Sequence, residues 1–306
     1  MIKRTLYFGN PAYLKTRNEQ LVIENQDTAE TKQCAIEDIG VVIIDHPQIT
    51  LTQALIAKLL ANNVALITCN ETHHPTGLLL NLDGHTLQSQ KFQAQVEASQ
   101  PLKKQLWQQT IAAKITNQAA WLQQLKVPVK NLQNWAKDVK SGDTDNYEAM
   151  AAVYYWKHAF THTVFAPTTE TPFQRDRMGT PPNHLLNYGY AILRAIVARS
   201  LVASGLLPTL GIFHKNQYNA YCLADDVMEP YRPFVDRLVW KIVRDRGIYL
   251  DMGVDIKKQL LTIPTIDVLM KDQKSPLMIA VQKTTASLAA CFEGKLRRIA
   301  YPEWVE

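Results

Sequence analysis

The stretch LKKQLWQQTIAAKITNQAAWL, residues 102–122, carries the pattern that decides the fold of most of this chain. Its apolar residues recur every three to five positions, at Leu102, Leu106, Ile111, Ile115, Ala119 and Leu122. This spacing places them along one face of an α-helix, and such a face is stable when it packs against other helices. The stretch therefore predicts a long helix within a helical core.

The same helical period continues toward the C-terminal end of the sequence. It predicts a short helix around Trp135 and further helices over residues 146–160, 183–204, from about 230, and 281–292. Gly142 and Gly205 lie where two of these patterns stop, as glycine commonly does after the last turn of a helix. Residues 86–306 are therefore predicted to form an all-α domain.

Residues 1–85 show the pattern of short strands instead. Runs of apolar, aromatic and β-branched residues predict strands over residues 4–8, 12–16, 20–24, 41–44, 64–67 and 78–82. Between Leu51 and Leu60 the apolar residues repeat at helical spacing, and Thr50 with Gln53 forms a capping box that would begin this helix. One helix is therefore predicted among the strands.

Together these patterns predict an α+β protein of two domains. Residues 1–85 form a β-rich, β-sandwich-like domain with one helix, and a short linker near residues 84–95 leads into the all-α domain, residues 86–306. The apolar strands of the first domain exceed what so small a module buries alone. We therefore expect this domain to supply the contact of a homodimer.

Composition and charge narrow the class of protein. Hydrophobic residues make up 46% and charged residues 20% of the chain, which is ordinary for a globular protein. The four cysteines form no CxxC pair, so neither a disulfide framework nor a zinc ribbon is expected, and a cytoplasmic location is the simplest setting. Residues 86–306 hold 27 basic and 19 acidic residues, whereas residues 1–85 hold 6 and 9. This asymmetry indicates a polyanionic partner or merely a soluble basic domain.

The sequence lacks the common catalytic signatures. GxxxxGK[ST], GxGxxG, HExxH and GxSxG are absent from the 306 residues. Classes of enzyme that depend on a P-loop, a dinucleotide fold, a zincin helix or an α/β-hydrolase elbow therefore lose support. The chemistry has to come from isolated polar residues in an otherwise apolar helical region.

Glu148 is the first such residue. It lies in Asp145-Asn146-Tyr147-Glu148, where Asp145 as N-cap and Glu148 three positions later would form a capping pair. The small residues at 149, 151 and 152 favour another reading, because they let a second helix approach and bury the carboxylate. A buried carboxylate needs a cation, so Glu148 is either a helix cap or a ligand.

His214, Asp226 and Glu229 complete the set of polar candidates. His214 ends an apolar stretch broken by Gly and Pro, and Asp226 and Glu229 share one face of a helical turn. One imidazole with two or three carboxylates suits Mg²⁺ or Mn²⁺, and such sites serve phosphoryl transfer. The alternatives are an ordinary loop histidine and charges that decorate a helix start.

Other polar residues are candidates for metal ligands or DNA contacts. His158 and His162 have metal-ligand spacing without a third ligand nearby, and His73-His74 precede Pro75 in a loop where both would be solvated. Side chains suited to DNA are Arg175, Arg177, Asn187, Tyr188, Arg232, Lys271 and Lys274. Each alone is also compatible with packing or with a solvated charge.

Several segments in a fixed order resemble a known family. They are residues 4–14 (RTLYFGNPAYL), 145–152 (DNYEAMAA), 187–190 (NYGY), 211–216 (GIFHKN) and 225–233 (DDVMEPYRP). In this order they resemble the universal CRISPR-associated endonuclease/integrase, which inserts new spacers into a CRISPR array, and most closely its type II branch. The resemblance extends from residue 1 to about 300.

The resemblance implies a site and a reaction. It implies a metal triad of Glu148, His214 and Glu229, with Asp226 as a second acid near the site, and Mg²⁺ or Mn²⁺ as the cofactor. It implies a stable homodimer, double-stranded DNA from spacer and repeat as substrate, and a complex with the small second CRISPR adaptation protein. The function expected is metal-dependent DNA integration by 3′-hydroxyl transesterification. A non-catalytic nucleic-acid scaffold and a metal-dependent repair nuclease are the alternatives.

Overall fold

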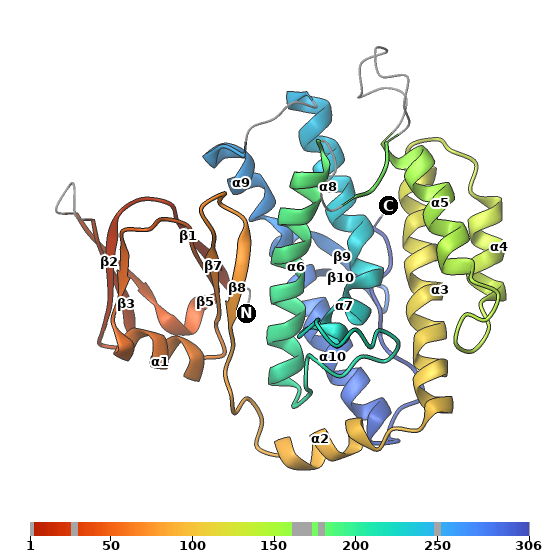
Figure 1. Cartoon of the computed structure of the whole chain (residues 1–306), viewed down its shortest axis with the longest axis horizontal. Coiled ribbons are helices and arrows are strands. Elements are labelled where there is room, and N and C mark those ends of the chain that lie inside the picture. The colour runs from red at the N-terminus through yellow and green to blue at the C-terminus, as the bar shows by residue number, and fades with distance from the viewer. Residues whose placement is uncertain (1–2, 26–29, 161–172, 177–180, 248–251, 306) are drawn as a thin grey trace.

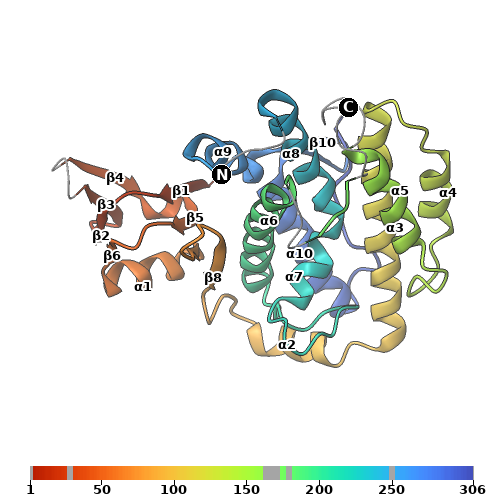
Figure 2. The same ribbon diagram turned by 45° about the horizontal axis from the view of Figure 1, so that its top comes forward.

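The computed structural model describes residues 3–25, 30–160, 173–176, 181–247 and 252–305. Figure 1 shows a strand-rich region at the N-terminal end of the chain and a helical region beside it, with β8 and α6 at the boundary between them. The same two regions are separate in the turned view of Figure 2. The predicted α+β class with strands first and helices second is confirmed.

The strand-rich region contains two four-stranded sheets. The first has the order β1-β5-β7-β8, with the bounds Arg4–Phe8, Ile39–Ile44, Ala65–Cys69 and Pro75–Leu79. The second has the order β4-β3-β2-β6, with the bounds Thr31–Ala35, Gln20–Asn25, Ala12–Arg17 and Ile49–Leu51. The predicted hairpin around Asn18 joins β2 to β3, whereas β4 and β6 have no counterpart among the predicted strands.

Helix α1, Gln53–Ala61, packs its Leu55 and Leu59 into the core of this region. Its cap differs from the one predicted. The Thr52 hydroxyl accepts the backbone N–H of Leu55, while Thr50 lies within β6. A strand leads into the helix directly, and therefore the first residue after β6, rather than Thr50, takes the capping position.

The sheet β1-β5-β7-β8 is buried on both faces. On β5, Val42 belongs to the core of the strand-rich region, whereas Val41 and Ile43 belong to the core of the helical region. On β7, Leu66 and Ile67 divide in the same way. Because neighbouring residues of a strand point to opposite faces, a strand buried on both faces reads as an unbroken apolar run. The apolar surplus of residues 1–85 is therefore buried within this chain, which removes our argument for a dimer contact there.

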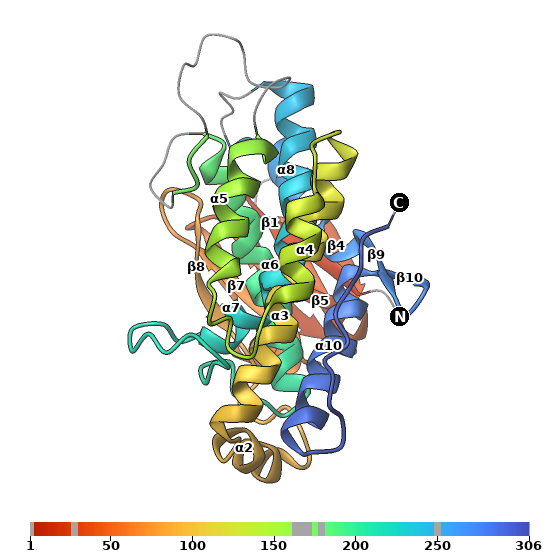
Figure 3. The same ribbon diagram turned by 90° about the vertical axis from the view of Figure 1, so that its right-hand side faces the viewer.

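The helical region begins earlier than the predicted linker allowed. Helix α2, Gln88–Val96, occupies most of residues 84–95 and packs against α10. The other helices are α3 Gln100–Gln124, α4 Lys130–Asp138, α5 Tyr147–Ala159, α6 Asn183–Ala203, α7 Cys222–Met228, α8 Arg232–Arg246, α9 Val254–Leu260 and α10 Leu277–Phe292. In Figure 3, α3, α4 and α5 lie side by side on the face turned to the viewer.

The region is not wholly helical. Strands β9, Asp267–Met270, and β10, Gln273–Pro276, form an antiparallel hairpin between α9 and α10. The short alternating run that forms β9 has no helical period, and our prediction of an all-α domain overlooked it.

Helix α6 is the central helix of the helical region. It is long and apolar enough to cross a membrane by length and composition, but 83% of its most apolar window is buried inside the molecule. It packs against α7, α8, α10 and the strands β7 and β8. These contacts account for its apolar composition as that of a core helix.

Candidate active site

Two carboxylates from distant parts of the sequence meet at one lysine. Glu148 lies in the first turn of α5, and Glu229 begins the 3-10 turn that follows α7. Lys114 Nζ, on α3, lies 2.8 Å from Glu148 Oε1 and 2.7 Å from Glu229 Oε2. The two carboxylate oxygens are therefore no further apart than these two distances together. Lys114 and Glu229 are only 9% and 5% exposed and so lie in the interior, whereas Glu148 is partly exposed.

Helix α3 holds this cluster together. One turn beyond Lys114, the Asn117 amide donates to the Pro230 carbonyl at 2.8 Å and to the Pro302 carbonyl at 3.0 Å. Glu229 immediately precedes Pro230, so the same helix face binds the backbone of the turn and the side chain of the acid. Ala151 of α5 is fully buried, as the predicted close approach of helices requires.

Glu148 is not part of a capping pair with Asp145. The Asp143 carboxylate accepts the backbone N–H groups of Tyr147 and Glu148, both at 2.9 Å, and so caps α5 itself. Asp145 instead pairs with Lys140 on the surface. The Glu148 side chain therefore does not cap the helix and instead forms an ion pair with Lys114.

His214 lies close to these carboxylates, and its Nδ1 is hydrogen-bonded to Asp226. His214 Nδ1 forms a short hydrogen bond with Asp226 Oδ1, and the other oxygen of Asp226 accepts the Phe213 backbone N–H at 2.9 Å. The bond to Asp226 raises the pKa of His214, and the charges of Glu229 and Glu148 add to the effect. With Nδ1 engaged, Nε2 is the nitrogen left for a ligand. Asp226 is fully buried, so its carboxylate can orient the imidazole of His214.

The turn that presents His214 depends on Gly211. A Cβ at this position would lie 2.3 Å from the His214 carbonyl oxygen and 2.8 Å from Asp226 Oδ2. Gly211→Ala is therefore expected to displace the histidine and its carboxylate partner by a fraction of an ångström. A misplacement of this kind costs about 10- to 100-fold in rate. We expect that loss in a DNA-joining assay with an unchanged far-UV circular dichroism spectrum, whereas wild-type joining would show that the turn accommodates a methyl group.

The cluster has the chemistry of a site for a hard divalent cation. Among the described residues no group of three or more His, Cys, Asp and Glu side chains is arranged around a common point, because Lys114 lies between the two glutamates. Burial lowers the pKa of Lys114, but Glu229 and Glu148 outweigh it and raise the pKa, so the lysine is charged. Glu229 Oε2 is buried and accepts no hydrogen bond of ordinary geometry. A cation thus already lies between two carboxylates, and the donor set fits Mg²⁺ or Mn²⁺.

An arginine-lined pocket borders the cluster. It has a volume of about 330 Å³, and its lining is His74, Pro75, Arg175, Asn187, Tyr190, Ala191, Arg194, Met228 and Arg232. Arg232 joins it to the cluster, because its Nη2 lies 2.9 Å from Glu229 Oε1. The guanidinium groups of Arg232 and Arg175 both lie over the Tyr190 ring, at 4.8 and 5.3 Å from its centroid.

The arginines of this pocket differ in their partners. Arg194 forms a two-pronged ion pair with Asp225, at 2.7 and 3.0 Å. Arg175 donates to the amide oxygens of Asn187 and Asn183, and within the described part of the chain no carboxylate lies within ion-pair distance of it. Among the described residues, its guanidinium therefore contacts amide oxygens and the Tyr190 ring in the pocket lining.

The predicted DNA contacts separate into distinct groups. Arg175, Asn187 and Arg232 come together in the pocket. Tyr188 does not, since it is fully buried, with its ring edge against His74, so it is not placed to contact DNA. Lys271 and Lys274 are exposed on the β9–β10 hairpin, away from this pocket. Arg177, and also His162, lie outside the described residues.

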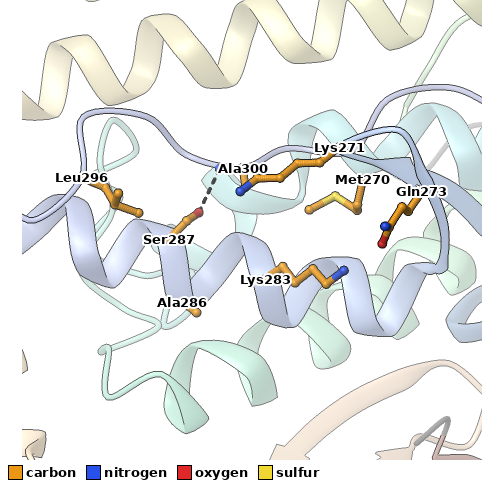
Figure 4. Close-up of a pocket in the computed structure, with 8 residues that line it drawn as sticks. All are labelled: Met270, Lys271, Gln273, Lys283, Ala286, Ser287, Leu296 and Ala300. Carbon is orange, nitrogen blue, oxygen red and sulfur yellow. Dashed lines mark hydrogen bonds between the residues drawn. The ribbon is translucent and has the colours of Figure 1, made fainter.

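A larger pocket, of about 550 Å³, shares no residue with the cluster. Figure 4 shows its lining from the β9–β10 hairpin, α10 and the C-terminal segment: Met270, Lys271, Gln273, Lys283, Ala286, Ser287, Leu296 and Ala300. Ser287 Oγ accepts the Ala300 backbone N–H and donates to the Thr284 carbonyl, so its hydroxyl is fully engaged. None of the predicted catalytic residues faces this pocket.

Lys114 and Arg194 are the two site residues that the sequence interpretation missed. Lys114 follows Ile111 by three positions, so it continues the apolar face of α3 that the helical period predicts to be buried. A lysine on such a face needs a carboxylate partner. That signal was present in the sequence, although it does not say which acid is the partner.

Comparison with known proteins decides the family. A family model described as CRISPR associated protein Cas1 matches residues 6–255. The chain belongs to this family. The CRISPR-associated endonuclease Cas1 of Neisseria meningitidis is 33% identical over 99% of this chain and 97% of its own length. A Cas1 endonuclease of Saccharolobus solfataricus is 27% identical over 76% of this chain and 73% of its own length. The predicted resemblance to a CRISPR-associated endonuclease/integrase is thus confirmed.

Solved structures show the same fold. A casposase bound to its integration product has a TM-score of 0.78 and 19% identity, covering 98% of this chain and 93% of its own. The Cas1 protein of Thermotoga maritima has a TM-score of 0.77 and 15% identity, covering 99% of this chain and all of its own. The arrangement of strands and helices described above is therefore the Cas1 fold.

Proposed function

We propose that this Cas1 protein joins the 3′-hydroxyl end of a spacer DNA to a phosphodiester at the boundary of a CRISPR repeat, using Mg²⁺ or Mn²⁺. The observation that carries the proposal is the convergence of Glu148, Glu229 and His214 beside an arginine-lined pocket. Family membership and the likeness to a casposase in complex with its integration product support the reaction class.

Each residue of the cluster has a separate task in this proposal. Glu148, Glu229 and His214 Nε2 would hold the cation, which would supply charge to polarise the target phosphate and to offset the charge that develops on it. Burial opposes the ionisation of Glu229, but Arg232 and Lys114 hold its pKa below the usual value, so the acid is charged and able to bind. Asp226 keeps the imidazole oriented through Nδ1.

The reaction needs no nucleophile from the protein. The 3′-oxygen of the spacer strand forms a bond to the target phosphorus and loses its proton. The bond from that phosphorus to the target's own 3′-oxygen breaks, and the departing oxygen takes up a proton. One phosphodiester is exchanged for another, which agrees with the absence of a P-loop from the sequence.

The pocket arginines are placed to bind the DNA backbone. Arg175→Gln is expected to weaken DNA binding several-fold and to lower the slope of log affinity against log salt by about 1, because one phosphate contact is lost. Fluorescence anisotropy titrations at several salt concentrations measure both quantities. Lys137→Gln, on the exposed surface of α4, is the matched control, and an equal loss in that variant would show that the pocket has no special part in binding.

The proposal includes partners and a place of action. We infer that the chain forms a homodimer and assembles with the small second CRISPR adaptation protein in the cytoplasm. One solved structure of similar fold, with a TM-score of 0.74 and covering 98% of this chain and 36% of its own, is a Cas6-RT-Cas1–Cas2 complex. Sedimentation equilibrium of the whole chain tests the dimer, for which a monomer at micromolar concentration would be the contrary result.

A joining assay tests the function itself. The purified chain, its small partner and a divalent metal are incubated with a labelled DNA duplex that has free 3′-hydroxyl ends and a plasmid that carries a CRISPR array. We expect the label to become covalently attached at a repeat boundary and EDTA to prevent this. Binding without attachment would favour a nucleic-acid scaffold, and cutting without attachment would favour a repair nuclease.

A further inference from the structure

An exposed aromatic ring lies directly beside the proposed metal ligand His214. Phe213 is 48% exposed, whereas the preceding Ile212 is buried. The Phe213 ring lies parallel to the indole of Trp107, with 4.4 Å between centroids and 2° between planes. Trp107 belongs to α3 and is only 1% exposed. One face of the Phe213 ring therefore covers the buried indole, and the exposure belongs to the opposite face and the edge.

The ring is held in this position from several sides. The backbone N–H of Phe213 donates to the buried Asp226 carboxylate at 2.9 Å. The imidazole of His214 meets the ring edge-on, with 5.5 Å between centroids and 89° between planes. The close turn at Gly211 precedes it. Phe213 thus presents a fixed flat surface next to the cluster, without having to be ordered when a ligand arrives.

A nucleobase is the ligand that matches this surface. A DNA strand that brings a reacting atom to His214 has to pass the neighbouring residue, and its bases are flat aromatic rings. Stacking on an aromatic side chain strengthens binding by about 5- to 150-fold per base and tolerates any sequence. An internal base must first leave its own stack, which is costly, but the last base of a strand already has one open face.

We propose that Phe213 is the stacking platform for the 3′-terminal base of the incoming DNA strand, and so positions the attacking 3′-hydroxyl beside the cluster. This inference rests on the proposed function for the identity of the DNA end. It adds a base-binding residue to a site that otherwise contacts only phosphate and metal. Phe213 recognises the presence of a base and not its identity.

The test uses 2-aminopurine at the 3′ terminus of a duplex, in EDTA, so that binding is measured without joining. Stacking quenches 2-aminopurine fluorescence, and we expect strong quenching at saturating wild-type protein. Phe213→Leu keeps an apolar cover over Trp107 and should lose most of this quenching, while Phe213→Tyr should restore it. Tyr218→Leu, which changes an 88% exposed aromatic residue of the same loop, is the matched control and should behave as wild type.

A second measurement links the ring to the base itself. With metal present, removal of the 3′-terminal base from the DNA should slow wild-type joining about 5- to 150-fold and should add little to the defect of Phe213→Leu. Equal quenching by wild type and Phe213→Leu, or equal slowing of both by the abasic end, would overturn the stacking proposal. A failure of wild type to join intact DNA would instead count against the proposed function. The quenching measurement in EDTA does not depend on joining, so it tests the stacking proposal separately.

Discussion

Glu229→Gln is expected to reduce DNA joining by about 10³-fold or more, equivalent to about 4 kcal/mol of transition-state stabilisation. The substitution keeps the shape of the side chain but removes one of two carboxylates from the cluster, so the hold on the divalent cation weakens. DNA binding should persist, because the arginines proposed to contact phosphate are separate side chains and the loss of a negative charge reduces repulsion. Joining should recover in part at high Mn²⁺ concentration.

Joining kinetics at limiting metal and anisotropy with labelled DNA measure the two effects. Glu97→Gln, at the exposed residue that follows α2, is the matched control and should join DNA at the wild-type rate. Near-normal joining by Glu229→Gln at limiting metal would contradict the assignment of Glu229 as a ligand.

The structure adds a cost in stability to this variant. Glu229 is the common partner of Lys114 and Arg232, so its neutralisation leaves Lys114 with Glu148 alone and removes the ion-pair partner of Arg232. Removing one partner of a buried ion pair costs about 3–5 kcal/mol at most. We therefore expect a lower melting temperature together with a folded protein at the temperature of the joining assay, and thermal melts should precede the kinetics.

Lys257→Met is expected to destabilise the fold by about 3–5 kcal/mol, because it leaves a buried carboxylate without its cation. Lys257 Nζ, on α9, lies 2.6 Å from Asp45 Oδ2, at the end of β5, and both residues are 4% exposed. Tyr7 and His73 also hydrogen-bond to Asp45. The pair connects the strand-rich region to the helical region, so its loss acts on the contact between them.

Urea denaturation of the variants measures this effect. Lys258→Met changes the neighbouring lysine, whose side chain is 70% exposed, and should alter the free energy of unfolding by less than about 1 kcal/mol. The double variant Asp45→Asn/Lys257→Met should recover part of the loss, since no unpaired charge remains. A Lys257→Met variant as stable as wild type would show that Tyr7 and His73 alone sustain the carboxylate.

His73 and His74, which the sequence predicts to be solvated, differ in the structure: His73 is exposed, whereas His74 is partly buried. His73 Nδ1 lies 2.8 Å from Asp45 Oδ1. Burial lowers the pKa of His74, whose ring meets the edge of Tyr188. The loop that carries both histidines is folded against the rest of the molecule, and a run of polar residues before a proline does not reveal such a contact.

The long elements of this fold were predictable because their pattern is local. The apolar face of α3 and the unbroken runs of β5 and β7 extend over enough residues for their period to be recognised. The short elements β4, β6, β9 and β10 were missed, since none of them contains an unbroken run of four apolar residues like those at β5 and β7. Their pairing with neighbouring strands is what makes them strands.

The caps of α1 and α5 show where local reasoning fails. Thr50 and Thr52 both suit the start of α1, and Asp143 and Asp145 both suit the start of α5. The choice depends on where the preceding chain segment enters the helix, which is a matter of tertiary structure. The sequence could therefore offer Glu148 as a cap or a ligand but could not choose between them.

The sequence by itself determined that strands come first and helices second, the family resemblance, and the acids and the histidine that are candidates for the site. Only the tertiary structure decided that Lys114 joins Glu148 to Glu229, that Asp226 stands behind His214, and that the apolar strands are buried within the chain. The physical reason is the separation along the chain of the residues that interact. A helical or strand period is written in successive residues, whereas an ion pair between residues on separate helices exists only once packing has brought those helices together.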